Sequence, residues 1–166
     1  NVATDASNKE RINRWNCALR MFKEKPVLGW GPGTYQFQYA PFQKSYEKTI
    51  ISTNAGDMGN AHSEYLGPLS ESGLLGMLSL LGVIITVVIV ALRRYKLTKD
   101  KQTRTLLLMA LTGLVTYFIH GFLNNFLDTD KASVPYWGFI AIIVAVDLFH
   151  SNHEKDIEDE KKLHQK

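Results

Sequence analysis

Features that would mark a metal- or nucleotide-dependent enzyme are missing from this sequence. Its single cysteine, Cys17, cannot form a disulfide within the chain. His62 does not begin an HExxH motif, and no second His or Cys lies at ligand spacing from it. The glycine-rich stretch 26–35 lacks both the GxGxxG spacing and the lysine of a phosphate-binding loop. The sequence therefore predicts neither a metal ion nor a cofactor.

Apolar residues are distributed unevenly along the 166 residues. The mean hydropathy of −0.11 would suit a soluble protein, but it averages clustered apolar segments with polar ones. The formal net charge of +3 is modest and predicts no nucleic-acid partner. Because the chain begins at Asn1 with sequence typical of the middle of a protein, we expect it to be the C-terminal piece of a longer one.

Three segments are predicted to cross a membrane as helices. Residues 73–92 are 20 residues without a charge, and a helix of that length rises about 30 Å, the thickness of a bilayer's hydrocarbon core. A buried segment of a soluble core is the alternative. The β-branched run 83–90 would form a poor helix in water, whereas lipid enforces helix formation because unpaired backbone groups are costly there. Residues 105–127 and 134–149 are the second and third candidates.

The basic connection 93–104 sets the predicted orientation. It contains six Lys or Arg and one Asp, and short loops with that excess stay in the cytoplasm. Residues 1–72 and the connection 128–133 are then outside, and 150–166 form a charged cytoplasmic tail. The predicted fold class is all-α: a fragment of a polytopic membrane protein with three transmembrane helices and an extracytoplasmic loop that contains an amphipathic helix.

The outer segment is predicted to contain this amphipathic helix at about residues 8–24. Ser7 and Glu10 fit a capping box at its start, and Pro26 follows its end. One face carries Ile12, Trp15, Leu19 and Phe22. Arg11 points into the same sector, and two interpretations are open. Its stem could cover apolar surface while its head reaches water, or its guanidinium could bind a phosphate near the membrane.

His62 is predicted to lie in a second helix, at about residues 60–72, just before the first span. Pro68 predicts a break or kink within this helix. An imidazole that can take up a proton near pH 7 is a good general base. A structural histidine that is hydrogen-bonded to a loop carbonyl is the alternative. Residues 35–58 have no clear period and are predicted to form an irregular external loop.

Taken together, these motifs resemble the C-terminal part of the O-antigen ligase and polymerase superfamily. The resemblance covers about residues 7–90 and rests on the order and spacing of four features. These are an Arg–Ile pair followed by Trp and Ala–Leu, a P-x-x-G-x-G-x-G turn, an H-x-x-x-L motif and an E-x-G-x-x-G motif that enters the first span. The matching residues are Arg11, Ile12, Trp15, Ala18, Leu19, Pro26, Gly29, Gly31, Gly33, His62, Leu66, Glu71, Gly73 and Gly76.

The resemblance implies a multi-pass inner-membrane glycosyltransferase of lipopolysaccharide or other surface-polysaccharide synthesis, with residues 1–72 in the periplasm. The donor would be a glycan on undecaprenyl pyrophosphate, and the acceptor a lipid A–core sugar or another glycan. Membrane lipid would surround the protein. His62 would be the catalytic base and Arg11 the catalytic cation that stabilises the leaving diphosphate. Arg14 and Glu71 would bind substrate. Family members also use arginines from earlier loops, so we expect this fragment to be inactive alone.

Two other classes are open. A non-enzymatic polysaccharide or lipid transporter, or a flippase subunit, would use the same helices as a passage and Arg11 as a substrate clamp. A membrane-anchored binding module would have an outer segment that folds alone. Ligases and polymerases share the motifs above and differ mainly in their acceptor, so the sequence does not separate them.

Overall fold

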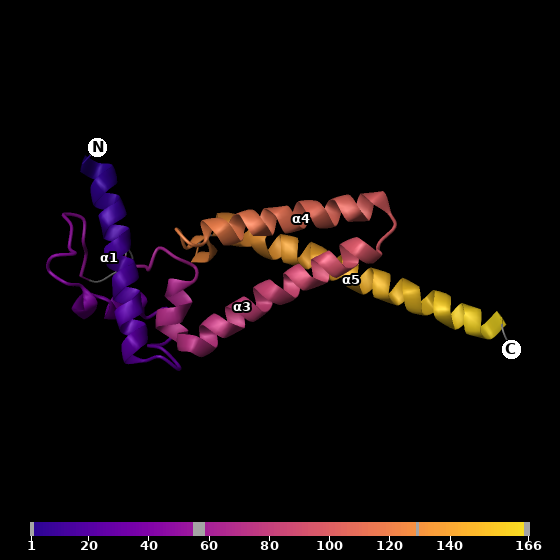
Figure 1. The fold of residues 1–166 in the computed structure, drawn as a ribbon, viewed down its shortest axis with the longest axis horizontal. Helices are drawn as coiled ribbons and strands as arrows, with labels where there is room; N and C mark the ends of the chain where they lie inside the picture. Colours follow the sequence, from indigo (N-terminus) through magenta and orange to yellow (C-terminus); the bar gives the residue numbers. More distant parts are fainter. Residues whose placement is uncertain (1, 55–58, 129, 165–166) are drawn as a thin grey trace. The chain divides into compact units, whose positions relative to one another are not determined.

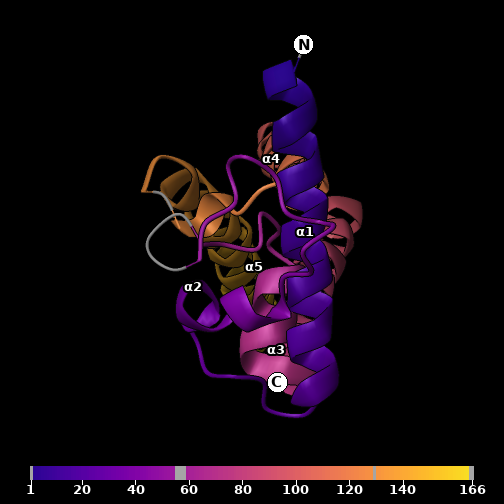
Figure 2. The same ribbon diagram turned by 90° about the vertical axis from the view of Figure 1, so that its left-hand side faces the viewer.

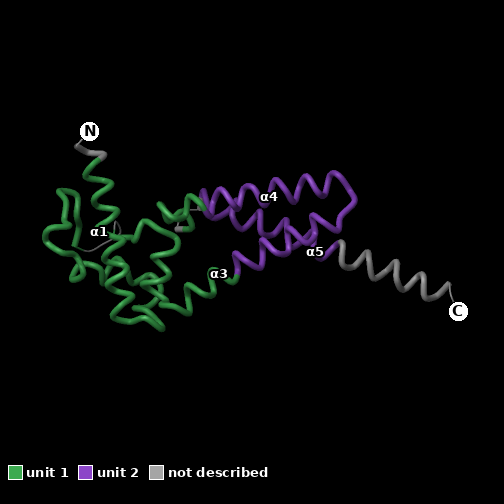
Figure 3. Tube along the Cα trace, viewed as in Figure 1, with its two compact units in different colours: residues 1–82, 119–129 green, residues 83–118, 130–166 purple. Residues whose placement is uncertain are grey.

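The structure is a computed structural model that describes residues 2–54, 59–128 and 130–164. All regular elements within these residues are helical, which confirms the predicted all-α class. The chain divides into two compact units, which Figure 3 shows in different colours. Unit 1 comprises residues 1–82 and 119–129, and unit 2 comprises residues 83–118 and 130–166.

Five α-helices make up most of the described residues (Figure 1). They are α1 (Val2–Glu24), α2 (Tyr35–Gln38), α3 (Leu66–Leu97), α4 (Lys101–His120) and α5 (Asp130–His164), with the short 3-10 helices η1 (Ala40–Phe42) and η2 (Phe126–Asp128). Within the described residues, three segments are long and apolar enough to cross a membrane: Leu66–Leu97, Lys101–His120 and, within α5, Lys131–Phe149. Only 11% to 17% of each apolar window is buried, so most of this surface requires lipid or further protein to cover it.

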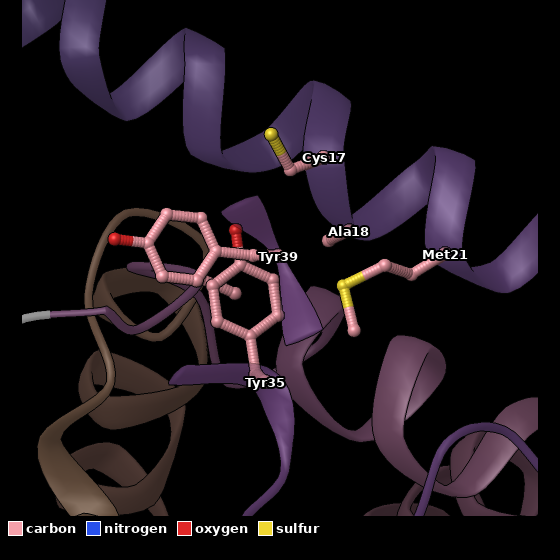
Figure 4. Packing of buried hydrophobic residues seen from close by; sticks show 6 residues of the cluster. Cys17, Ala18, Met21, Tyr35 and Tyr39 are labelled. Atoms are coloured by element: carbon pink, nitrogen blue, oxygen red, sulfur yellow. The ribbon is translucent and has the colours of Figure 1, made fainter. Parts of the chain in front are cut away.

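Unit 1 has a small core on one face of α1. Its buried apolar residues are Cys17, Ala18 and Met21 from α1, Tyr35 and Tyr39 from the region of α2, and Ala61 (Figure 4). The rings of Tyr35 and Tyr39 stack with their centroids 5.3 Å apart. Burial raises the pKa of the Cys17 thiol to about 11, so this cysteine is a packing residue and not a nucleophile.

The buried face of α1 is not the predicted apolar stripe. Asn13 and Arg14 are 1% and 2% exposed, whereas Ile12 and Leu19 are 54% and 41% exposed. The loop that follows α2 runs along α1 (Figure 2) and supplies polar partners to the buried side chains. One of these is Gln43, whose side-chain oxygen accepts a hydrogen bond from the Asn13 amide at 3.0 Å. Polar side chains can be internal here because their hydrogen bonds are made.

The predicted start of α1 is wrong. The helix begins at Val2, so Ser7 and Glu10 lie inside it and do not form a capping box. Glu10 instead is buried and accepts hydrogen bonds from the hydroxyls of Thr49 and Ser52. These contacts also give order to the loop that was predicted to be irregular, whose described part includes α2 and η1.

The helix that was predicted from about residue 60 begins only at Leu66. The Ser63 hydroxyl accepts hydrogen bonds from the backbone N–H groups of Tyr65 and Leu66 at 3.3 and 3.4 Å, as an N-cap does. Pro68 lies in the first turn, where no helical hydrogen bond needs its N–H, and does not break the helix. The break lies at Gly73, where φ is 64° and ψ is −158°.

Unit 2 contains the second half of α3 together with α4 and α5, and Figure 1 shows α4 and α5 side by side. Gly113 allows this approach, because a β-carbon there would lie less than 3.0 Å from the ring of Phe139. The ring of Tyr136 packs on that of Tyr117, with 4.6 Å between centroids. The second half of α3 is tied to α5 by an ion pair between Arg94, which is 5% exposed, and Asp147.

The outer ends of the later helices differ from the predicted spans. Helix α4 runs from Lys101 to His120, so residues 121–127 of the predicted second span are not part of it. The carbonyl of Gly121 accepts a hydrogen bond from the backbone N–H of Glu64 at 2.8 Å, which holds this connection in a turn. Helix α5 begins at Asp130, within the predicted external connection 128–133.

Candidate functional site

The turn that carries His62 has an unusual backbone. His62 has φ of +48° and is the one non-glycine residue with positive φ in the described part of the chain. Its backbone N–H donates to the side-chain oxygen of Asn60 at 3.1 Å, and its carbonyl accepts from the indole N–H of Trp15 at 3.4 Å. A backbone in this region costs free energy, and such residues cluster at functional sites. The turn therefore presents His62 beside α1 instead of on a face of α3.

The environment of the His62 imidazole favours its neutral form. Burial has the largest effect and lowers the pKa of His62, and the positive charges of Arg14 and Arg11 lower it further. The carboxylate of Glu10 acts in the opposite direction, without reversing the shift. The ring is partly exposed and has no hydrogen-bond partner within the residues that the structure describes. A neutral imidazole with a free nitrogen can accept a proton from a substrate.

The two candidate arginines of α1 have different surroundings. Arg14 is 2% exposed; its Nε lies 2.7 Å from a carboxylate oxygen of Glu10, and its Nη2 donates to the Thr53 hydroxyl at 2.7 Å. Its guanidinium also stacks on Tyr39, 4.3 Å from the ring centroid. Arg11 is partly exposed and makes no hydrogen bond or ion pair with any residue of the described ranges. The guanidinium of Arg14 is thus held by contacts within the protein, whereas the N–H groups of the Arg11 guanidinium remain available to a ligand.

Glu10 joins the outer loop to the helix that carries both arginines. Burial by itself would raise the pKa of Glu10, but hydrogen bonds from Ser52, Arg14 and Thr49 outweigh it and hold the pKa below its ordinary value. The sequence interpretation missed this role, because it assigned Glu10 to a capping box. The sequence could have indicated the ion pair, because Glu10 and Arg14 are four residues apart and such pairs are neighbours on a helix.

The glycine-rich turn after α1 docks against the break in α3. The carbonyls that the break leaves free, those of Ser70 and Glu71, accept hydrogen bonds from Trp30 and Gly31 at 3.2 and 2.7 Å. In return, the backbone N–H of Leu74 donates to the carbonyl of Pro26 at 2.8 Å. The turn and the break therefore satisfy each other's backbone groups in the way that helix ends require.

Glycine is needed on both sides of this contact. Gly29 and Gly73 have φ values of 67° and 64°, and a β-carbon at either position would lie less than 3.0 Å from backbone atoms of the other segment. The Glu71 carboxylate adds a second tie, because its two oxygens accept the backbone N–H groups of Gly33 and Tyr35 at 3.0 and 2.8 Å. Glu71, predicted to bind substrate, thus supports the start of α2.

Like Glu71, Glu64 accepts a backbone hydrogen bond from a segment that is distant in the sequence. Its carboxylate accepts the backbone N–H of Leu127 at 2.6 Å, and the ring of the neighbouring Tyr65 lies 4.4 Å from that of Phe122. The connection between α4 and α5 is thereby fastened to the residues that follow His62. The sequence interpretation did not single out Glu64, and no local pattern marks a partner 63 residues away.

A cavity of about 520 Å³ is lined in part by the residues that flank His62. Asn60, Ser63, Glu64, Glu71 and Asn125 contribute polar atoms to its lining, which contains no lysine or arginine. Neither His62 nor Arg11 lines it. The charges of Arg11 and Arg14 thus act on the His62 imidazole, whereas Glu71 lines the cavity. No three His, Cys, Asp or Glu side chains of the described residues are grouped so that they could hold a metal ion.

Comparison with known proteins finds a matching family and a distant relative. Residues 1–81, which contain α1, the glycine turn, the His62 turn and the first half of α3, match the family model described as O-antigen ligase. An uncharacterized protein of Haemophilus influenzae is 23% identical over 129 residues. This alignment covers 76% of the present chain and 31% of that protein, so the chain spans about a third of its relative's length. No solved structure matches the chain.

The matched residues all lie within unit 1, and they contain both motifs that the structure joins at the helix break. By this match, residues 1–81 of the chain belong to the O-antigen ligase superfamily.

Proposed function

We propose that the complete protein transfers a glycan from undecaprenyl pyrophosphate to a sugar hydroxyl, on a lipid A–core or on another glycan, at the outer face of the inner membrane. The observation that carries the proposal is that the positive charge of Arg11 acts on the His62 imidazole. Neither side chain has a hydrogen-bond partner among the described residues; His62 lies just before the apolar helix α3, and Arg11 lies on α1. Family membership and the three apolar helices support the membrane location.

In this reaction the acceptor hydroxyl attacks the anomeric carbon of the donor glycan. The bond between that carbon and the diphosphate oxygen breaks, and its electron pair leaves with the diphosphate. His62 takes the hydroxyl proton as the new C–O bond forms, a task for which a neutral imidazole is suited. No metal ion or nucleotide is needed to balance the step.

The role of Arg11 in this mechanism is to stabilise the leaving diphosphate. Negative charge grows on the diphosphate as the bond breaks, and a fixed cation stabilises that charge more strongly near lipid than in bulk water. A guanidinium is suited to this task because it is permanently charged and presents a planar set of donors to phosphate oxygens. The proximity of Arg11 also favours the neutral imidazole that the acceptor side requires.

Arg14 and Glu71 act as positioning residues in this proposal and not as substrate ligands. Arg14 is saturated by Glu10, Thr53 and the ring of Tyr39, and Glu71 by two backbone N–H groups. Arg14 still contributes its charge to the electrostatic environment of His62. Residues 1–72 lie on the periplasmic side in this arrangement, because the basic connection 93–104 is held in the cytoplasm.

The test is glycan transfer by the complete gene product, reconstituted in liposomes with a lipid-linked donor. The His62→Asn variant removes the base while asparagine tolerates the positive φ of this position. We expect the rate of transfer to fall roughly 100-fold or more while donor binding is retained. His120→Asn, an exposed site at the end of α4, is the matched control. Transfer at the unaltered rate in His62→Asn would remove His62 from the mechanism.

A further inference from the structure

A basic pocket lies where α3 joins α4, entirely within unit 2. Its volume is about 420 Å³, and it is lined by Tyr95, Lys99, Lys101, Arg104, Thr105 and Leu108. Half of these residues are positively charged and none is acidic. This pocket lies outside residues 1–81 that match the family, and neither the proposed transfer reaction nor the site around His62 uses it.

The cations of this pocket are not neutralised by the chain itself. Lys99, Lys101 and Arg104 are exposed, and none of them forms an ion pair within the part of the chain that the structure describes. The acidic residue of this connection, Asp100, directs one carboxylate oxygen to the backbone N–H and the hydroxyl of Thr103, each at 2.7 Å. Asp100 therefore caps α4. Three uncompensated positive charges around one hollow attract an anion.

Two features give the pocket a defined shape and a mixed chemistry. The guanidinium of Arg104 lies 4.6 Å above the ring of Tyr95, which holds the cation in one orientation over the pocket. Leu108 also lines the pocket, and Leu97 and Leu106 nearby in sequence are 52% and 43% exposed. A cationic rim next to exposed leucines fits a ligand with a phosphate at one end and a hydrocarbon chain at the other.

We propose that this pocket binds the headgroup phosphate of an anionic phospholipid in the leaflet next to residues 93–104. The phosphate lies among Lys99, Lys101 and Arg104, and an acyl chain runs along Leu108. A soluble phosphate compound would gain nothing from the leucines, so charge and apolar surface together favour the lipid. A bound lipid would also fix this basic end of the two helices at the membrane surface.

The experiment compares two double variants of the complete gene product with equal changes in charge. Lys101→Gln/Arg104→Gln removes one lysine and one arginine from the pocket, and Arg93→Gln/Lys96→Gln removes one of each from exposed positions outside it. Each protein is extracted from nanodiscs that contain equal amounts of phosphatidylglycerol and phosphatidylcholine. Native mass spectrometry then counts the lipids that remain bound, and titration with short-chain phosphatidylglycerol gives the affinity. Circular dichroism and membrane insertion verify that both variants are folded.

We expect the unaltered protein and the Arg93→Gln/Lys96→Gln variant to retain phosphatidylglycerol in preference to phosphatidylcholine. The pocket variant should bind phosphatidylglycerol on the order of tenfold more weakly. Arg104→Lys, which keeps the charge, should retain most of the affinity. An equal loss in both double variants would overturn the proposal, because it would show a general effect of surface charge. Binding of inorganic phosphate with no preference for the lipid would overturn it as well.

Discussion

The backbone of Gly73 lies directly against that of Val27. A β-carbon at position 73 would stand less than 3.0 Å from the Val27 carbonyl oxygen, which accepts the backbone N–H of Leu75 at 3.4 Å. This contact joins two motifs that are more than 40 residues apart in the sequence. It holds the break in α3, and the His62 turn lies one short segment before that break.

Gly73→Ala should therefore destabilise unit 1. Alanine would be forced into a positive φ and would overlap the Val27 backbone, so we expect a loss of about 2–3 kcal/mol. The measurement is thermal unfolding of the detergent-solubilised protein, followed by tryptophan fluorescence. Gly67→Ala is the matched control, since Gly67 lies in the same helix with open space around it and without positive φ. Equal melting of the two variants would contradict the packing described above.

Arg11→Gln should reduce glycan transfer roughly 100-fold, because it removes the cation proposed to stabilise the departing diphosphate. The rate constant for transfer at saturating donor is the quantity to measure. Lys9→Gln makes the same change in charge at an exposed position of α1 and should have little effect. If the two variants behave alike, the contribution of Arg11 is a general effect of surface charge and not catalysis.

The pH dependence of transfer should report the charges around His62. The pKa of His62 is held below its ordinary value of 6.5, by burial first and then by Arg14 and Arg11, so the neutral base persists below neutral pH. The rate should fall only as the pH drops through this lowered pKa. Removal of the Arg11 charge in Arg11→Gln raises the pKa of His62, so the acid limb of the residual activity should move to higher pH. Arg11→Lys keeps the charge and should leave the limb where it is.

Glu10→Gln should destabilise unit 1 by about 3 kcal/mol at neutral pH, because it leaves the buried Arg14 guanidinium without its counter-charge. The pKa of Glu10 is lower in the folded state than its ordinary value of 4.5. Its contribution is therefore present above pH 4.5 and is lost as the pH falls through the folded-state pKa.

Acid titration of unfolding stability tests this second effect. The unaltered protein should lose stability below pH 4.5 more steeply than Glu10→Gln does. Asp5→Asn, at an exposed position of the same helix, should resemble the unaltered protein. A parallel loss in all three proteins would assign the acid sensitivity to other carboxylates.

The limits of sequence reasoning are clearest on α1. Hydrophobic periodicity assigned its inner face to Ile12 and Leu19, but the structure buries Asn13 and Arg14 instead. Periodicity assumes that polar side chains prefer water, and this fails where a distant segment supplies their hydrogen bonds. Thr53, which holds Arg14, lies 39 residues further along the chain. The same limit applies to Glu64, whose partner is the backbone of Leu127.

The sequence by itself determined the all-helical class, the three apolar helices and the family, because an uncharged run and the order of motifs are properties of consecutive residues. Only the tertiary structure showed that Arg14 is held by Glu10 while Arg11 has no such partner among the described residues. It also showed that His62 lies in a turn with positive φ before α3. It also placed the helix break at Gly73, where backbone groups of a remote turn replace the lost helical bonds. These outcomes depend on hydrogen bonds between distant segments, and their free energies do not appear in any local pattern.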